Sequence, residues 1–206
     1  MQIIQQNYDK QQLNQLPVEK FDGRIIVINN LADARKAVRY LMQFPILGID
    51  TETKPNFKKG QMNKVALLQV ANHDTAFLFQ LHLTGMTDDI RRLLESQEVM
   101  KVGLSLKDDL RQLNLRRKFT PGNFVELQEM VKEIGIDDMS LQKIYANLFG
   151  KKISKTKQLS NWNAEILDEG QRRYAALDAV ACLRIYDKIR SLEQTHDFQL
   201  AAIPES

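Results

Sequence analysis

Two carboxylates lie two positions apart at the end of an apolar run. The run Ile46–Thr53 reads I-L-G-I-D-T-E-T and predicts a strand that ends with Asp50 and Glu52. Side chains two apart on a strand share a face, so both acids point to one side and Thr51 to the other. Ionised neighbours repel, and a bound divalent cation compensates them more completely than one lysine could. An exposed strand end is the alternative.

A second acidic pair, Asp108 and Asp109, follows a predicted buried strand at 100–106 and begins the next helix. The dipole and the free backbone N–H groups at a helix N-terminus favour negative charge there, so acids in a first turn have an ordinary explanation. A helix cap and a metal ligand are therefore both open for this pair.

A tyrosine and an aspartate share one face of a late helix. Tyr174 and Asp178 lie four residues apart within a run of strong helix formers, Q-R-R-Y-A-A-L-D-A-V-A. Such a pair can join a metal site or form a hydrogen-bonded pair on a surface helix, and spacing alone does not separate the two interpretations.

Taken in order, D-x-E, a strand-to-helix aspartate and Y-x-x-x-D resemble the signature of the DEDD exonuclease superfamily, tyrosine subclass. Five longer segments are also similar to the Werner-type exonuclease domain: K-V-A-L-L-Q-V-A at 64–71, K-V-G-L-S-L-K-D-D at 101–109, N-F-V-E-L at 123–127, L-S-N-W at 159–162 and Y-A-A-L-D-A at 174–179. The resemblance covers residues 24–190. It implies a ribonuclease H-like α/β fold and removal of nucleotides from DNA 3′ ends.

The resemblance also implies a set of site residues. The catalytic residues would be Asp50, Glu52, Asp109, Tyr174 and Asp178, and the four acids would hold two divalent cations, Mg²⁺ or Mn²⁺. Alignment on Gly103 and on Gln112-Leu113 favours Asp109 over Asp108 as the second-motif aspartate. A shift of one residue would exchange these two roles.

The roles of these residues follow the two-metal pattern of phosphodiester cleavage. By resemblance, Asp50, Glu52 and Asp178 bind the ion that activates the attacking water. Asp50 is the main ligand of a second ion, which steadies the leaving oxygen, and Asp109 acts partly through water. Tyr174, whose ordinary pKa is ~10, orients the attacking water by hydrogen bonding and is not expected to act as a strong base.

Substrate contacts are expected in two basic segments. Thr53, Lys54 and Phe57 belong to the loop T-K-P-N-F-K-K-G, where lysines could contact phosphates and Phe57 could stack on a base. Lys155 and Lys157 belong to the densest basic stretch, K-K-I-S-K-T-K at 151–157. A solvated loop and ordinary surface charge are the alternatives. Trp162 is interpreted as a packing anchor and not as a stacking platform.

The elements that must position these residues predict an α/β fold. Strands are expected at 24–30, 46–53, 64–71, 75–81 and 100–106, with a hairpin turn at 72–74, and helices at 31–44, at 87–96 and from 107. The remaining chain is expected to be almost entirely helical. We therefore predict a ribonuclease H-like mixed sheet flanked by helices, with a largely helical C-terminal half. The expected organisation is a polar leader at 1–22, the exonuclease domain at 23–195 and a tail at 196–206.

Composition limits the remaining possibilities. A net charge of +3 allows a phosphate-rich partner without requiring one. One cysteine, Cys182, excludes an internal disulfide, and three histidines make a Cys/His zinc site an unfavoured interpretation. No stretch reaches the ~18 apolar residues of a membrane span. We expect a cytoplasmic protein without membrane association or a dedicated protein partner.

The sequence is compatible with three functions. The first is a 3′→5′ exonuclease acting on DNA, which the segments outside the acids favour. The second is a ribonuclease D-like 3′-5′ exoribonuclease, because metal ligands alone do not distinguish DNA from RNA. The third is a nucleic-acid-binding module that has lost catalysis. The presence of all four acids and of Tyr174 argues against the third.

Overall fold

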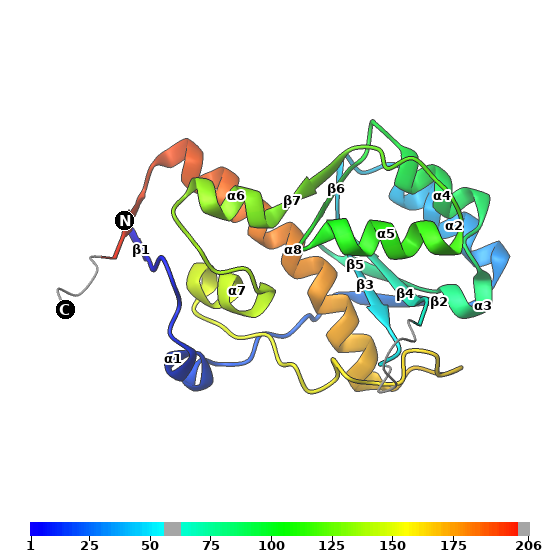
Figure 1. Ribbon diagram of the computed structural model, residues 1–206, viewed down its shortest axis with the longest axis horizontal. Helices are drawn as coiled ribbons and strands as arrows, with labels where there is room; N and C mark the ends of the chain where they lie inside the picture. The colour runs from blue at the N-terminus through cyan, green and yellow to red at the C-terminus, as the bar shows by residue number, and fades with distance from the viewer. Residues whose placement is uncertain (56–62, 202–206) are drawn as a thin grey trace.

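The computed structural model describes residues 1–55 and 63–201 (Figure 1). Its elements, in chain order, are β1 (Gln2–Ile4), α1 (Lys10–Gln15), β2 (Arg24–Ile28), α2 (Leu31–Leu41), β3 (Ile46–Thr53), β4 (Val65–Ala71), β5 (Thr75–Gln80), α3 (Leu81–Thr84), α4 (Asp88–Glu95), β6 (Met100–Gly103), α5 (Leu106–Arg116), β7 (Phe124–Glu126), α6 (Leu127–Glu133), α7 (Leu141–Phe149), α8 (Glu169–Thr195) and β8 (Phe198–Leu200).

A six-stranded sheet with the order β2-β5-β4-β3-β6-β7 forms the centre of the molecule. Strands β3, β4 and β5 run antiparallel to their neighbours in this group, while β2, β6 and β7 are added in parallel. The predicted hairpin is β4–β5, and it lies beside the strand that ends in D-T-E. The sheet is therefore mixed, as the sequence predicts.

Helices cover both faces of this sheet (Figure 1). One apolar core joins the sheet to α6, α7 and α8, and a second joins the opposite face to α2, α4 and α5. Because both faces are covered, every residue of β4 and β5 is buried. This explains why those two strands read as continuous apolar runs and lack a polar alternation.

Side-chain caps fix where the helices begin. Asn30 accepts from the Asp33 amide at the start of α2, and Thr87 accepts from the Ile90 amide at the start of α4. The long helix α8 begins with a capping box in which Asp168 and Gln171 each accept from the other's backbone amide. Tyr174 and Asp178, two of the candidate site residues, lie in the turns that follow this start.

The expectation that the chain is almost entirely helical after residue 107 is wrong, and two segments show this most clearly. Residues 124–126 form β7, which pairs in parallel with β6 at the sheet edge. Pro121 and Gly122 interrupt the helical pattern before this strand, and its aromatic and β-branched residues suit an edge. The connection at 150–168 is largely irregular.

The leader at 1–22 is packed onto the body. Its strand β1 pairs in parallel with β8, so the two ends of the described chain lie side by side. Ile4, Leu13 and Phe21 are buried. The Asn147 side chain accepts from the Gln5 amide at 3.0 Å and donates to the Gln5 carbonyl at 2.6 Å. Within the described residues, no helix is both long and apolar enough to span a membrane.

Candidate active site

Close packing of α8 on β3 creates the site. A Cβ built on Gly48 would collide with the backbone carbonyl of Ala179, so only glycine allows this approach of helix to strand. Asp50 and Glu52 follow Gly48 on the same face of β3, and Asp178 precedes Ala179 on α8. The contact between the two elements therefore brings the three acids together.

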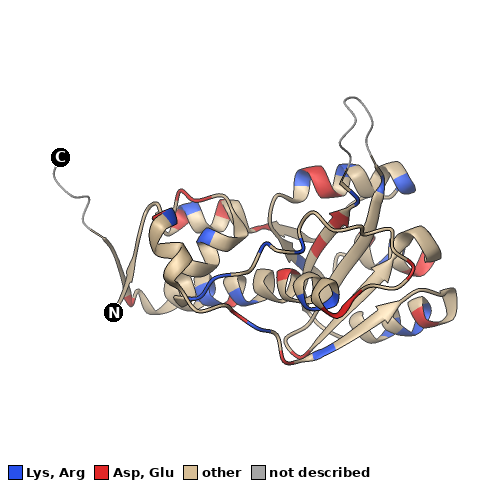
Figure 2. Cartoon of the chain, turned by 90° about the horizontal axis from the view of Figure 1, so that it is seen from below, with Lys and Arg blue, Asp and Glu red and all other residues tan. Residues whose placement is uncertain are grey.

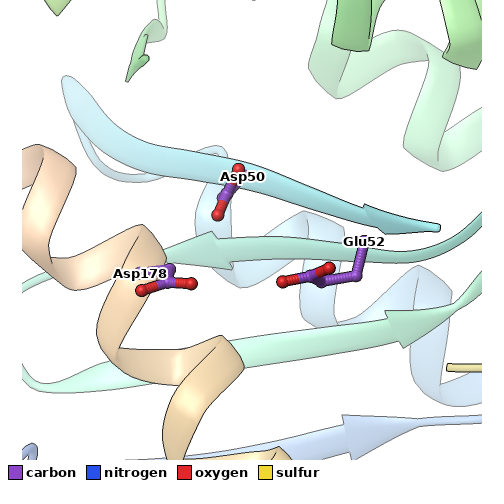
Figure 3. A group of neighbouring side chains, drawn as sticks. All are labelled: Asp50, Glu52 and Asp178. Carbon is purple, nitrogen blue, oxygen red and sulfur yellow. The ribbon is translucent and has the colours of Figure 1, made fainter. Parts of the chain in front are cut away.

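The carboxylates of Asp50, Glu52 and Asp178 point toward one another (Figure 3). One oxygen from each lies within 4.8 Å of the other two. Two of these side chains come from a strand and the third comes from a helix more than a hundred residues later. The predicted convergence of the D-x-E pair with the late aspartate is thus present in the fold.

Asp109 reaches the same cleft from α5 and is held by Thr51. The Thr51 hydroxyl donates to Asp109 Oδ1 at 2.6 Å, and the Thr51 amide donates to Asp50 Oδ1 at 2.9 Å. Thr51 points to the face of β3 opposite Asp50, which is the face that α5 covers. Asp109 lines the cleft, whereas Asp108 is exposed and does not.

Tyr174 and Asp178 lie one turn apart on α8, with Cys182 one turn further. All three line the cleft. The Tyr174 ring packs near Trp162, with 6.0 Å between ring centroids. Trp162 is fully buried and donates its indole N–H to the Gln158 carbonyl at 3.3 Å. It is a packing anchor, as predicted.

Burial and mutual repulsion dominate the electrostatics of the site. Burial, with repulsion from Asp178 and Asp109, raises the pKa of Glu52 to about 9. Burial and repulsion from its acidic neighbours also raise the pKa of Asp50 well above its ordinary value. In the absence of other cations, this cluster favours bound protons.

The pKa values of Asp178 and Asp109 are raised less, because each carboxylate has a partner that stabilises its charged form. Burial raises the pKa of Asp178 to about 7, against hydrogen bonding from Tyr174 and the positive charge of Lys155. Burial raises the pKa of Asp109 to about 6, against its hydrogen bond from Thr51. The pKa of the Tyr174 phenol is raised by burial and by the nearby carboxylates, so the phenol keeps its proton.

All five predicted catalytic residues line one cleft of about 370 Å³. Its other walls come from the start of α5, the start of α7 and the connection that follows α7. The cleft-lining residues outside the predicted catalytic set are Thr51, Leu104, Ser105, Met139, Ser140, Leu141, Gln142, Ile153, Lys155, Gln158 and Cys182. The cleft is therefore lined by a cluster of acidic side chains together with a mixture of apolar and uncharged polar residues and one lysine.

Residues 25–193 match the family described as 3′-5′ exonuclease. This chain belongs to the 3′-5′ exonuclease family. This family and the similar proteins fit the DEDD superfamily of hydrolytic nucleases, as the sequence resemblance implies.

Individual proteins agree with this assignment. The mouse bifunctional 3′-5′ exonuclease/ATP-dependent helicase WRN is 30% identical over 87% of this chain, and DNA polymerase I of Aquifex aeolicus is 28% identical over 77%. The aligned region spans only 14% and 26% of those two proteins. Escherichia coli ribonuclease D shares the fold, with a TM-score of 0.75 at 17% identity over 83% of this chain and 45% of that one.

The donor set of the exonuclease-family site fits divalent cations. Its converging ligands are carboxylate oxygens, which hard cations such as Mg²⁺ and Mn²⁺ prefer. Positive charge placed among Asp50, Glu52 and Asp178 would offset the repulsion that raises their pKa values. Members of this family use divalent metal ions, and the residues present here are suited to hold them.

The predicted substrate-binding residues lie in different surroundings in the structure. Lys155 lines the cleft, while the Lys157 ammonium lies 2.8 Å from the Asp168 carboxylate at the start of α8. Thr53 ends β3, Lys54 is exposed, and Phe57 lies outside the described residues. Figure 2 shows basic and acidic positions interspersed on the side that carries the connection between α7 and α8. The substrate roles of these residues stay predictions.

Three features of the site were not identified from the sequence. The strand spacing puts Thr51 on the far face of β3, but its partner Asp109 lies in another element, which the spacing does not indicate. Cys182 could have been found, because it continues the four-residue spacing of Tyr174 and Asp178. Gly48 also carried a signal, since glycine inside a strand indicates a close approach of another backbone.

Proposed function

We propose that this protein is a two-metal-ion 3′→5′ exonuclease that removes nucleoside monophosphates from the 3′ end of DNA. The observation that carries the proposal is the convergence of Asp50, Glu52 and Asp178 within 4.8 Å. Asp109 and Tyr174 lie in the same cleft. A binding module would not need five such residues around one buried, electrostatically unfavourable point.

The residues divide the work of the reaction. Asp50, Glu52 and Asp178 hold the cations, whose bound charge would activate a water nucleophile and stabilise the phosphate and the departing 3′ oxygen. Asp109, oriented by Thr51, completes the acidic wall. Tyr174 remains a neutral phenol, and with Asp178 engaged on a cation its single O–H would be free to orient the attacking water by hydrogen bonding. Lys155 contacts a phosphate oxygen at the cleft rim.

The choice of DNA is supported by the two sequence relatives described above, an exonuclease/helicase and a DNA polymerase. RNA is the second candidate, because the neighbour from Escherichia coli is described as an exoribonuclease involved in structured RNA processing. That likeness concerns the fold, and the metal ligands are the same for both polymers. The preference must therefore be measured.

The deciding experiment follows 5′-labelled single strands and recessed 3′ ends, in DNA and RNA versions, with Mg²⁺ or Mn²⁺. We expect a ladder that shortens from the 3′ end, requires the cation and degrades DNA faster than RNA. Asp178→Ala should abolish it. Asp187→Ala is the matched control, since Asp187 lies on the same helix and pairs with His73 away from the cleft.

Each result has a defined meaning. Faster degradation of RNA would replace the proposed substrate and keep the enzyme. Intact strands in the presence of either cation would reject the exonuclease in favour of a binding module. Equal activity in Asp178→Ala and in the natural protein would show that another site performs the cleavage.

A further inference from the structure

One carboxylate outside the catalytic set holds the starts of two helices. Glu126 ends β7, and its Oε1 accepts from the Ser105 amide at 2.9 Å and from the Gln128 amide at 3.0 Å. Its Oε2 accepts from the Leu106 amide at 2.7 Å. Amides at the starts of α5 and of α6 thus donate to the same carboxylate, which suits the positive end of each helix.

The start of α5 depends on this carboxylate because its own cap is absent. Ser105 occupies the N-cap position but has a φ of 62°, in the left-handed region, and its side chain accepts no amide of the helix. A non-glycine residue stays in this region only where its surroundings hold it. The hydrogen bonds that the Ser105 and Leu106 amides donate to Glu126 provide that restraint.

The helix held in this way carries Asp109. This aspartate lies in the first turn of α5, three residues after Leu106, and its Oδ1 accepts from Thr51. Any shift of the helix start would therefore move Asp109 relative to β3 and to the other acids. A misplacement of about 1 Å is enough to lower a rate by about 10²-fold.

A second link runs from α6 to the cleft-lining segment at the start of α7. The Gln128 side-chain amide donates to Ser105 Oγ and to the Met139 carbonyl, both at 2.9 Å. Met139 begins the cleft-lining segment 139–142. Gln142, which ends this segment, donates to the Ile153 carbonyl at 2.6 Å. Gln128 thus ties the loop before α5 to the wall at the start of α7.

We propose that Glu126 and Gln128 are positioning residues with separable roles in this active site. Glu126 fixes the position of Asp109 and thereby supports cation binding. Gln128 fixes the cleft-lining segment 139–142, against which the nucleotide lies. The second role rests on the proposed function. The first does not, because cation affinity is measured without any substrate.

The test of Glu126 compares three variants in Mn²⁺ binding and in turnover. Glu126→Ala should weaken Mn²⁺ affinity and lower kcat, each by about 10- to 100-fold, with little change in KM. Glu126→Gln keeps an accepting oxygen in place of Oε1, which accepts two of the three bonds, but sets a donating NH2 group against the Leu106 amide, so its losses should lie between those of Glu126→Ala and the natural protein. Glu129→Ala removes an exposed charge from the same helix turn and should match the natural protein.

The Gln variant also separates position from charge, because it removes the negative charge of Glu126 and keeps one accepting oxygen in place. Equal losses in Glu126→Gln and Glu126→Ala would overturn the capping role. So would a folded Glu126→Ala whose Mn²⁺ Kd and kcat lie within about twofold of the natural values. If Glu126→Ala does not fold, the decision rests on Glu126→Gln against Glu129→Ala, and a Mn²⁺ Kd of Glu126→Gln within about twofold of that of Glu129→Ala overturns the capping role.

For Gln128, the discriminating readout is the division between KM and kcat. Gln128→Ala should raise KM by about 10-fold and leave kcat and the Mn²⁺ Kd close to natural values, because only the substrate wall is loosened. An unchanged KM, or a loss of Mn²⁺ affinity equal to that of Glu126→Ala, would overturn the separate role. If the natural protein has no exonuclease activity, the proposed function fails, while the Mn²⁺ measurements still decide the role of Glu126.

Discussion

Tyr174 is the cleft residue whose chemical role can be separated from its packing role. Its ring packs beside Trp162, and its hydroxyl faces Asp178. Tyr174→Phe keeps the ring and removes the donor, so we expect kcat to fall by about 10²-fold because the attacking water is no longer oriented. The Mn²⁺ Kd, measured by calorimetry without substrate, should stay unchanged. Loss of cation binding in this variant would mean that the phenol supports the metal site itself.

Lys155 and Lys157 test whether a basic residue acts through its position. Lys155 faces the cleft, whereas Lys157 is paired with Asp168. Lys155→Ala should raise KM by about 10-fold, because the free energy lost is close to that of one charge-assisted hydrogen bond. It should also lower the salt dependence of binding by the amount expected for one phosphate contact. Steady-state kinetics at several salt concentrations measure both effects.

Lys157→Ala is the control for this prediction, because it removes the same charge two residues away. Its KM should change by less than about twofold, since its ammonium is paired with Asp168 and does not line the cleft. Equal effects of the two substitutions would indicate that the net charge of the loop controls binding, and that neither lysine has a defined contact.

The residue-level predictions from sequence succeeded where periodicity determines the outcome. Strand spacing placed Asp50 and Glu52 on one face, and helix spacing placed Tyr174 and Asp178 on another. Thr51 shows the limit, because its bond to Asp109 depends on which helix covers the far face of β3. That information is tertiary, and no local pattern in the sequence contains it.

At the level of elements, the contact between β3 and α8 controls the site. Gly48→Ala should force these elements apart, because the added Cβ collides with the Ala179 carbonyl. We expect a loss of about 1–3 kcal/mol in the free energy of unfolding and a weaker Mn²⁺ affinity, since Asp178 moves away from Asp50 and Glu52. Chemical denaturation and calorimetry measure the two effects.

Gly85→Ala is a control of similar cost at a remote place. Gly85 has φ 66° and ψ −177°, a backbone region essentially restricted to glycine, and a Cβ there meets nothing within 4 Å, so alanine introduces backbone strain of about 1–3 kcal/mol without a collision. This variant should lose stability and keep its Mn²⁺ affinity. If both glycine variants weaken cation binding equally, general destabilisation is the cause and the helix–strand contact has no special role.

Long apolar elements were predictable, and short ones were not. The buried strands β4 and β5 read directly from continuous apolar runs. Strands β1, β7 and β8 have three residues each and gain their order from partners, as in the pairing of Gln2 with Phe198. A three-residue segment carries too little periodicity to be recognised, so these strands were missed for a physical reason.

For the molecule as a whole, the residues outside 23–195 contribute to the fold. The leader buries Ile4, Leu13 and Phe21, and the Glu19 carboxylate accepts from the Tyr145 hydroxyl at 2.9 Å. Composition suggested a polar leader because glutamine dominates the segment, although its few apolar residues are the ones that enter the core. These contacts reach α7, whose first residues line the active-site cleft.

The acidic cluster links the stability of the molecule to pH and to cations. The pKa values of Glu52, Asp178 and Asp109 are raised to about 9, 7 and 6, above the ordinary values of about 4 in an unfolded chain. Between about pH 4 and pH 9, the folded protein therefore binds more protons than the unfolded chain. In the absence of divalent cations, this contribution to stability is therefore present at low pH and is lost as pH rises from about 4 to about 9.

Cation binding should reverse this trend, because Mn²⁺ or Mg²⁺ competes with the protons and binds the ionised carboxylates. At about 100 times its Kd, the cation adds about 2.7 kcal/mol, or roughly 5–10 °C in Tm for a chain of this size. We expect this increase in Tm to be large near pH 8 and small near pH 5, as measured by thermal unfolding with chelator or with cation. Asp33→Asn, at an exposed helix start, should retain the pattern, and the pair Asp50→Asn with Asp178→Asn should remove it. A cation-induced increase that is equal at both pH values would show that the cations bind away from the buried carboxylates.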